Sequence, residues 1–230
     1  MGLAPGSGLH HEQRRHLIER LRAAGIRDLA VLHAFDEVPR HLFVPELFQA
    51  RAYTDEALPI GHGQTISRPS THALYLETLG LTGGERVLEI GTGSGFQTAL
   101  LASLAERVYS IEWIPELAKA ARDRIEMLGF TNVLVRAGDG SYGWRRYAPF
   151  DVILVTAGAP EVPAALVGQL TEGGRMLVPL GDPEEQELHL LTREGDGTRD
   201  DVIGRVRFVG LQGPGGGERP SDSGGRDVDP

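Results

Sequence analysis

Three glycines at alternate positions, Gly91, Gly93 and Gly95, are the residues whose types and spacing most clearly indicate chemistry. They follow an apolar segment that ends at Ile90 and precede a helical pattern that begins at Phe96. Glycine has no Cβ, so its backbone can turn tightly and approach a ligand closely. The first turn of the following helix has unpaired N–H groups that suit a polar ligand. The pattern predicts a nucleotide-type cofactor site.

Two acidic residues extend this site. Glu112 ends the next expected strand, about 20 residues beyond the first glycine, where a carboxylate accepts hydrogen bonds from ribose hydroxyls. Asp139 and Gly140 follow the third strand, where a carboxylate can accept from an adenine amino group. With the loop residues Thr92 and Ser94, they predict a site for a cofactor that contains adenosine. Each acid also has a simpler interpretation, as a solvated strand end or as the start of an Asx turn.

Glu89 and Phe96 separate two adenosine-containing cofactors, NAD and S-adenosylmethionine. The NAD fingerprint has a third glycine, for close packing over a pyrophosphate, at the position that Phe96 occupies. A carboxylate at position 89, beside the loop, suits a cofactor with a cationic sulfonium and ammonium better than a pyrophosphate. The residues therefore favour S-adenosylmethionine, with an NAD-dependent oxidoreductase as the alternative. Glu89 can instead orient the loop backbone without touching a ligand.

Composition narrows the partners. The chain has 230 residues, of which 40% are hydrophobic and 24% charged, and is long enough for one α/β domain. Its net charge of −9 repels the phosphate backbone of nucleic acids. Segment 155–161 also lacks the Asn/Asp-Pro-Pro-aromatic motif of nucleic-acid amino-methyltransferases, so we expect no nucleic-acid partner. Cysteine is absent, which excludes disulfides, Cys–zinc sites and thiol nucleophiles and fits a cytoplasmic protein. We find no signal-peptide core, membrane-length apolar run or metal-ligand spacing, so we expect no export, membrane or metal.

The elements that must position these residues alternate strand and helix from Arg86 onward. Apolar strands in such an alternation predict an α/β fold with a mostly parallel, doubly wound sheet covered on both faces. An antiparallel pair, joined by a polar turn over 194–201, is expected to close it. The expected strands are 86–90, 107–112, 132–136, 151–155, 175–180, 187–192 and 202–211, and the expected helices are 96–105, 115–128 and 162–170.

The N-terminal part reads as a helical extension. Helices are expected over 12–24 and from an Asp28 cap to Val38, and a third, capped by Ser70 or Thr71, should end at Leu79. We expect residues 1–11 to be flexible and 214–230 to be a disordered tail, because the tail has too little apolar surface to offset its ordering entropy. A single domain should span 12–213, divided into a substrate-side segment (12–80) and a cofactor-binding core (81–213).

Several motifs resemble those of the protein-L-isoaspartate O-methyltransferase family, repair enzymes that methylate isoaspartyl residues in damaged proteins. The family-specific string is Gly63-Gln64-Thr65-Ile66-Ser67, whereas many methyltransferases share the glycine loop. The resemblance runs from about Glu12 to Gly213 and implies a Rossmann-like S-adenosylmethionine-dependent methyltransferase fold. Further matching segments are 38–41, 43–45, 52–53, 58–62, 88–95, 138–140, 148–151, 159–163 and 173–181.

The resemblance also implies roles for individual residues. It places Ser67 at the active site, with Ile66 and His72 lining the pocket near the cofactor. It also implies that the adenosine part of the cofactor is bound by Glu112, Asp139 and Gly140. The expected partners are isoaspartyl peptides and proteins, and the expected state is a monomer. The chain departs from the family pattern at Arg68, where an uncharged residue is commoner, and at Gly210, where the family has proline.

The expected chemistry needs alignment more than acid–base catalysis. The acceptor carboxylate is already anionic at neutral pH, so a neutral donor such as the Ser67 hydroxyl suffices to orient it. Other interpretations remain open from the sequence. The acceptor can be an aspartate of a biosynthetic peptide, or the chain can bind an adenosyl ligand without catalysis. Ser67 can be a helix cap beside Pro69, and His72 can pack locally.

Overall fold

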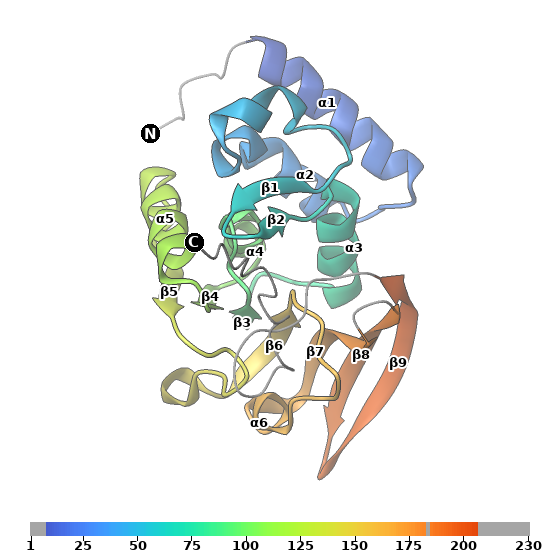
Figure 1. Ribbon diagram of the computed structural model, residues 1–230. Helices are drawn as coiled ribbons and strands as arrows, with labels where there is room; N and C mark the ends of the chain where they lie inside the picture. The colour runs from blue at the N-terminus through green and yellow to red at the C-terminus, as the bar shows by residue number, and fades with distance from the viewer. Residues whose placement is uncertain (1–7, 183–184, 207–230) are drawn as a thin grey trace, which may run out of the picture.

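A seven-stranded sheet forms the centre of the computed structural model, which describes residues 8–182 and 185–206 (Figure 1). The strand order is β5-β4-β3-β6-β7-β8-β9; the first five are parallel, and β8 and β9 are antiparallel additions. The strands are β3 (Arg86–Ile90), β4 (Arg107–Glu112), β5 (Val133–Ala137), β6 (Phe150–Val155), β7 (Leu170–Asp182), β8 (Glu185–Glu194) and β9 (Gly197–Val206). This confirms the expected α/β sheet.

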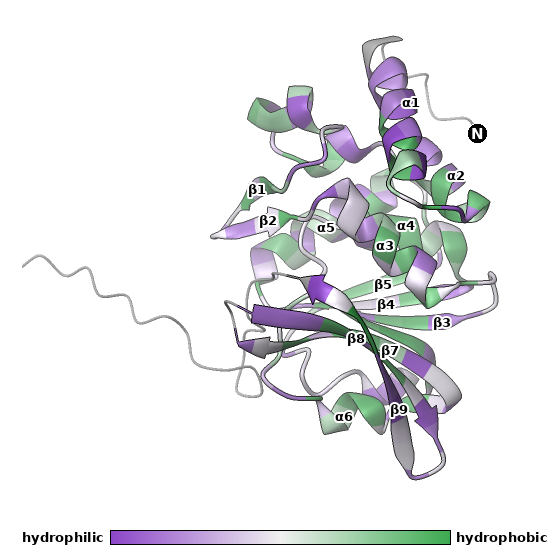
Figure 2. Ribbon diagram, turned by 90° about the vertical axis from the view of Figure 1, so that its right-hand side faces the viewer, coloured by the Kyte–Doolittle hydropathy of each residue, from purple (hydrophilic) through white to green (hydrophobic). Residues whose placement is uncertain are grey.

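Helices cover both faces of the sheet. Figure 2 shows α3 (Pro69–Leu79), α4 (Phe96–Leu104) and α5 (Pro115–Met127) on one side, with α6 (Ala164–Val167) on the other. Successive strand residues point to opposite faces, so Val87 joins the apolar cluster under α4 while Leu88 joins the cluster under α6. The central strands β3, β4 and β6 are therefore buried on both sides, whereas β9 is exposed. Helix α6 is shorter than the expected helix 162–170.

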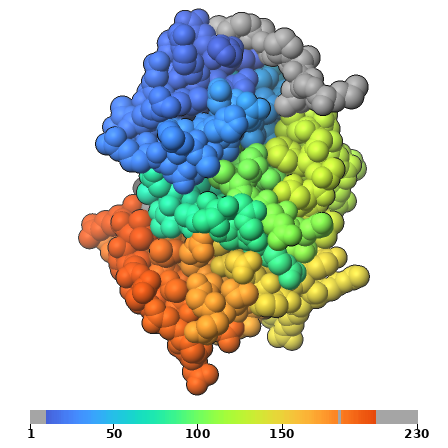
Figure 3. All heavy atoms as spheres, turned by 180° about the vertical axis from the view of Figure 1, so that it is seen from behind, coloured from blue at the N-terminus to red at the C-terminus, as the bar shows by residue number. Residues whose placement is uncertain are grey.

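The N-terminal segment packs onto the α4 face and shares its core. It comprises α1 (Gly8–Ala23), α2 (Leu29–Glu37), the 3₁₀ turns η1 (Arg40–Phe43) and η2 (Glu46–Arg51), and the hairpin β1 (Leu58–Gly61) and β2 (Gln64–Ile66). Leu17, Phe35 and Phe96 are buried in one cluster. From behind, the blue N-terminal segment covers the top of the molecule (Figure 3). Among the described residues, no helix combines the length and apolarity needed to cross a membrane.

Helix starts show where local signals succeeded and failed. Asp28 caps α2 as expected, because its side chain accepts from the N–H groups of Ala30 and Val31. The expected Ser70 or Thr71 cap of α3 is wrong. The helix begins at Pro69 without a local side-chain cap, and Asp55, from a distant loop, accepts from the Ser70 N–H at 2.9 Å.

Other boundaries also differ. The expected polar turn over 194–201 is wrong, because β8 continues to Glu194 and β9 begins at Gly197, which leaves a tight turn between two strands. Arg199 there forms ion pairs with Glu194 and Asp201 on the exposed hairpin. Helix α1 begins at Gly8, earlier than the expected residue 12. The predictions for the tail and for Gly210 lie outside the described residues.

Candidate cofactor and substrate pocket

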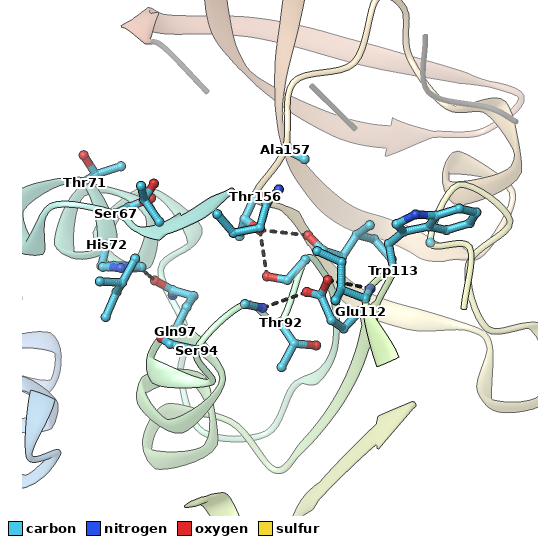
Figure 4. A pocket seen from close by; sticks show the side chains of 18 of the residues that line it. Ser67, Thr71, His72, Thr92, Ser94, Gln97, Glu112, Trp113, Thr156 and Ala157 are labelled. Atoms are coloured by element: carbon cyan, nitrogen blue, oxygen red, sulfur yellow. Dashed lines mark hydrogen bonds between the residues drawn. The ribbon is translucent and has the colours of Figure 1, made fainter. Parts of the chain in front are cut away.

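A cavity of about 350 Å³ opens at the carboxyl ends of β3, β4 and β6. The strand order reverses there, since β4 and β5 lie on one side of β3 and β6 and β7 on the other. Ligands of open α/β sheets bind at this kind of switch point. The segment between β2 and α3 forms the facing wall (Figure 4). Of the residues expected at the site, the cavity is lined by Ile66, Ser67, His72, Gly91, Thr92, Gly93, Ser94, Glu112 and Gly140.

Backbone conformation and close neighbours explain why the loop contains glycine at positions 91, 93 and 95. All three glycines have positive φ, at 99°, 54° and 89°. A Cβ on Gly91 would lie 2.3 Å from Thr156 Oγ1, whose hydroxyl donates to the Gly91 carbonyl at 2.9 Å. A Cβ on Gly95 would lie 3.1 Å from Ala121 of α5. Gly95 therefore serves the contact between loop and helix and does not line the cavity, whereas Gly91 and Gly93 do.

Glu112 joins the loop to the pocket. Its Oε2 accepts the Gly93 N–H at 2.8 Å, and its Oε1 accepts the Ile114 N–H at 3.0 Å. The residue is 6% exposed and lines the cavity. Each carboxylate oxygen has a second acceptor position, so both oxygens retain capacity for ligand hydroxyls.

Asp139 and Gly140 form a second polar corner. Asp139 Oδ1 accepts from the backbone and hydroxyl of Ser141, at 2.8 and 2.7 Å, which is the Asx-type turn that the sequence offered as the alternative interpretation. Its Oδ2 is buried and has no hydrogen-bond partner in the described part of the chain. Asp139 does not line the cavity, but Gly140 does, and a Cβ there would lie 2.3 Å from Ile90 Cγ2. A free acceptor beside a closely approached backbone fits an amino donor such as that of adenine.

Glu89 lies beneath the loop, away from the cavity lining. It is fully buried on the α4 face, and its Oε2 accepts from the hydroxyls of Thr98 and Ser110, each at 2.6 Å. Ser110 in turn lies 2.5 Å from the hydroxyl of Thr92, which lines the cavity. Burial raises the pKa of Glu89 to about 7, although the two hydroxyl donors oppose the shift. The second sequence interpretation, that Glu89 orients the loop, matches this geometry.

Ser67, His72 and Gln97 line the opposite side of the cavity (Figure 4). Ser67 is half-buried, and its hydroxyl bonds to no side chain or backbone group of the described residues. His72 Nδ1 lies 2.5 Å from Gln97 Oε1. Burial, with the positive charge of Arg40 as the second cause, lowers the pKa of His72 to about 3. The side chains of Ser67, His72 and Gln97 are therefore neutral polar groups at physiological pH, and the cationic Arg68 beside them in the lining is exposed.

Several residues that line the cavity were not predicted to do so from the sequence, namely Gln64, Thr71, Gln97, Trp113 and Thr156. Trp113 directly follows Glu112 and is 40% exposed at the cavity edge, and Thr156 directly follows β6. For Trp113 and Thr156, a position immediately after a strand at the switch point was the sequence signal that could have placed them at the cavity. No cluster of metal-ligating side chains occurs in the ranges that the structure describes.

The comparisons with known proteins agree with this geometry. The family model "Protein-L-isoaspartate(D-aspartate) O-methyltransferase (PCMT)" matches residues 12–215. The chain belongs to this family. A protein-L-isoaspartate O-methyltransferase of Dictyoglomus thermophilum is 47% identical over 204 residues, covering 89% of this chain and 93% of that protein. A protein-L-isoaspartate O-methyltransferase 1 of Anaeromyxobacter sp. is 55% identical over 204 residues, covering 87% and 96%.

Solved structures of the PCMT family share the fold. One protein-L-isoaspartate O-methyltransferase has a TM-score of 0.82 and 34% identity, over 88% of this chain and 67% of that one. A putative family member from Plasmodium falciparum, solved with S-adenosyl-L-homocysteine, has a TM-score of 0.76 and 27% identity, over 86% and 98%. Membership confirms the expected family, fold class and S-adenosylmethionine-dependent methyltransferase activity, and it argues against the NAD alternative. The roles of the individual residues stay predictions.

Proposed function

We propose that this protein transfers a methyl group from S-adenosylmethionine to the free carboxylate of L-isoaspartyl residues in damaged proteins. One observation carries the proposal. A single cavity is lined on one side by the glycine loop and Glu112, and on the other by the family-specific segment that ends at Ser67. The first side suits an adenosyl cofactor, and the second presents an unbonded hydroxyl to an acceptor.

The cofactor side has groups for each part of the donor. Glu112 would accept from the ribose hydroxyls, and the free Oδ2 of Asp139 would accept from the adenine amino group. The loop at Thr92 and Ser94 would face the methionyl part, with Ile66 and His72 near it. S-adenosylmethionine would supply a methyl group bonded to a sulfonium, whose sulfur leaves as a neutral thioether without protonation by an acid.

The acceptor side needs to supply alignment. A peptide carboxylate is ionised at neutral pH, so no base has to remove a proton. The Ser67 hydroxyl would donate a hydrogen bond and orient the carboxylate toward the methyl carbon without neutralising its charge. Correct alignment of two reactants accounts for roughly 7–11 kcal/mol of a barrier in favourable cases. The hydroxyl is free to do this, because no described residue bonds to it.

Two finer statements accompany this proposal. We propose that the protein acts as a monomer, which sedimentation velocity of the full chain would test. We also propose a cytoplasmic location, supported by an amino-acid composition without cysteine. Fractionation of cells that express the chain would test the location.

The deciding experiment compares two peptides that differ only in one aspartyl linkage. Tritiated cofactor should label the isoaspartyl peptide, with the label released as methanol in base, and leave the aspartyl peptide unlabelled. Equal labelling would indicate a different acceptor, and cofactor uptake without labelling would indicate a binding protein. Ser67→Ala should lower turnover at least about 10-fold, the loss of one hydrogen bond to a charged group, while calorimetry shows unchanged cofactor affinity. Ser103→Ala on α4, whose hydroxyl donates to the Ala99 carbonyl, is the matched control.

A further inference from the structure

Arg40 is an unusual buried charge next to the proposed active-site segment. Its side chain is 0% exposed, and no carboxylate lies within ion-pair distance of it among the described residues. Its guanidinium instead donates to backbone carbonyls, from Nε to Ala52 at 2.8 Å and from Nη2 to Ser67 at 2.7 Å. Burying a cation without an opposite charge is costly, so a specific use of its donors is expected.

The same guanidinium also contacts the cofactor side of the site. Its Cζ lies 4.8 Å from the centre of the Phe96 ring, a cation–π distance. Phe96 is the first residue of α4, directly after the glycine loop. The Phe96 ring also packs edge-on against His72, with 5.3 Å between ring centres. The Arg40 guanidinium thus donates a hydrogen bond to the Ser67 carbonyl and packs against the Phe96 ring at the start of α4.

Further contacts fasten the loop around Arg40 to the start of α3. Between the two loop carbonyls that Arg40 can reach, Ala52 and Glu56, lies Asp55. Asp55 accepts from the N–H and hydroxyl of Ser70, at 2.9 and 2.8 Å. The turn that carries Ser67 is therefore held from the interior by Arg40 and from the surface by Asp55.

We propose that Arg40 is a positioning residue for methyl transfer, which fixes Ser67 relative to the glycine loop and α4. This inference rests on the proposed function. Arg40 does not line the cavity, so it acts through the Ser67 backbone and Phe96. Its hydrogen bond to the Ser67 carbonyl sets where the neighbouring hydroxyl lies, and a displacement of about 1 Å between reacting groups costs roughly 100-fold in rate. Burial lowers the pKa of Arg40 to about 9, which still leaves the guanidinium charged at neutral pH.

The test separates alignment from stability. Arg40→Met keeps an apolar chain over Phe96 but removes every donor. Arg175→Met is the matched control, because Arg175 donates to the carbonyls of Leu79 and Gly80 at the opposite end of α3, far from Ser67. Three quantities are measured for the full-length wild type and for each variant. They are the single-turnover rate of methyl transfer to an isoaspartyl peptide, the affinity for S-adenosyl-L-homocysteine by calorimetry, and Tm. The wild-type rate shows independently whether the proposed function holds.

We expect Arg40→Met to lower the single-turnover rate about 100-fold, with cofactor affinity changed less than about 3-fold. Arg175→Met should lose Tm with a rate close to that of the wild type. Arg40→Lys, which retains one cationic donor group, should have an intermediate rate, and it serves alone if the methionine variant does not fold. The inference is overturned if the Arg40 variants transfer methyl at the wild-type rate. It is also overturned if the variants at Arg40 and at Arg175 show the same loss of rate for a given loss of Tm.

Discussion

Replacing Glu112 by glutamine tests how the cofactor side is built. The carboxylate accepts one backbone N–H on each oxygen, from Gly93 at 2.8 Å and from Ile114 at 3.0 Å. Glutamine has the same shape but only one acceptor oxygen, and its NH₂ group would face an N–H donor. One backbone donor therefore loses its partner, and one position loses its capacity to accept from a ribose hydroxyl.

The magnitude follows from these two losses. A hydrogen bond to a charged group contributes about 1.5–3 kcal/mol, so losing one to the ribose weakens cofactor binding about 10- to 100-fold. The unpaired backbone N–H costs about 1–3 kcal/mol of folding free energy. For a chain of this size each kilocalorie lowers Tm by roughly 2–4 °C. Both effects are expected together, because the same side chain holds the loop and the ligand.

Calorimetry with S-adenosyl-L-homocysteine measures the affinity, and thermal unfolding measures the stability. Glu116→Gln is the matched control, because Glu116 is an exposed carboxylate in the first turn of α5 and does not line the cavity. It should bind the ligand with wild-type affinity. If Glu112→Gln also bound with wild-type affinity, the reasoning that assigns this carboxylate to the ribose would be refuted.

Three further predictions concern packing, protonation and specificity. Gly140→Ala places a Cβ 2.3 Å from Ile90 Cγ2 and should lower the free energy of unfolding in urea by about 1–3 kcal/mol, with favourable coupling to Ile90→Ala in a double-mutant cycle. The pKa of His72 is about 3 in the folded protein against an ordinary value of 6.5, so below pH 6.5 the unfolded state takes up a proton that the folded state does not. Stability should therefore fall between pH 6.5 and 3, and urea titrations of His72→Gln should show a flatter fall. Arg68 is exposed at the cavity and pairs with no acid in the described segments. Arg68→Gln should therefore raise the KM for isoaspartyl peptides with acidic neighbours by a few-fold, and by less in high salt. The KM for peptides with neutral neighbours should stay unchanged.

The parts of the fold that were predictable are those with local signals. Strand β3, the glycine loop and α4 follow from an apolar run, three glycines and a helical period, and all three appear as expected. The β1–β2 hairpin was missed because its strands have only four and three residues and the first contains Pro59 and Gly61. Its turn instead depends on three consecutive positive φ values at Gly61, His62 and Gly63, of which the histidine gives no sequence signal.

The candidate site was predictable where one segment contains the motif, and not where distant segments meet. Gly91 and Glu112 belong to a known spacing, so their place at the cavity could be predicted. Gln97 is the second residue of α4 and Thr156 directly follows β6, and neither belongs to a known motif. Glu89 had two interpretations, and only the pairing of β3 with β4, which brings Ser110 opposite it, distinguishes a support beneath the loop from a group that faces the cavity.

The charges around the cavity support alignment over acid–base catalysis. The donor is cationic and the acceptor anionic, and their charges cancel as the methyl group moves, so a fixed cation against the acceptor would stabilise the ground state more than the transition state. Burial keeps His72 neutral, and Arg68, the one cationic side chain among the described residues of the lining, is exposed. The buried cation nearest to Ser67, Arg40, is bonded to backbone carbonyls and stays behind the wall. The acceptor wall thus keeps donors for orientation while it withholds a full counter-charge, which is the arrangement that this reaction requires.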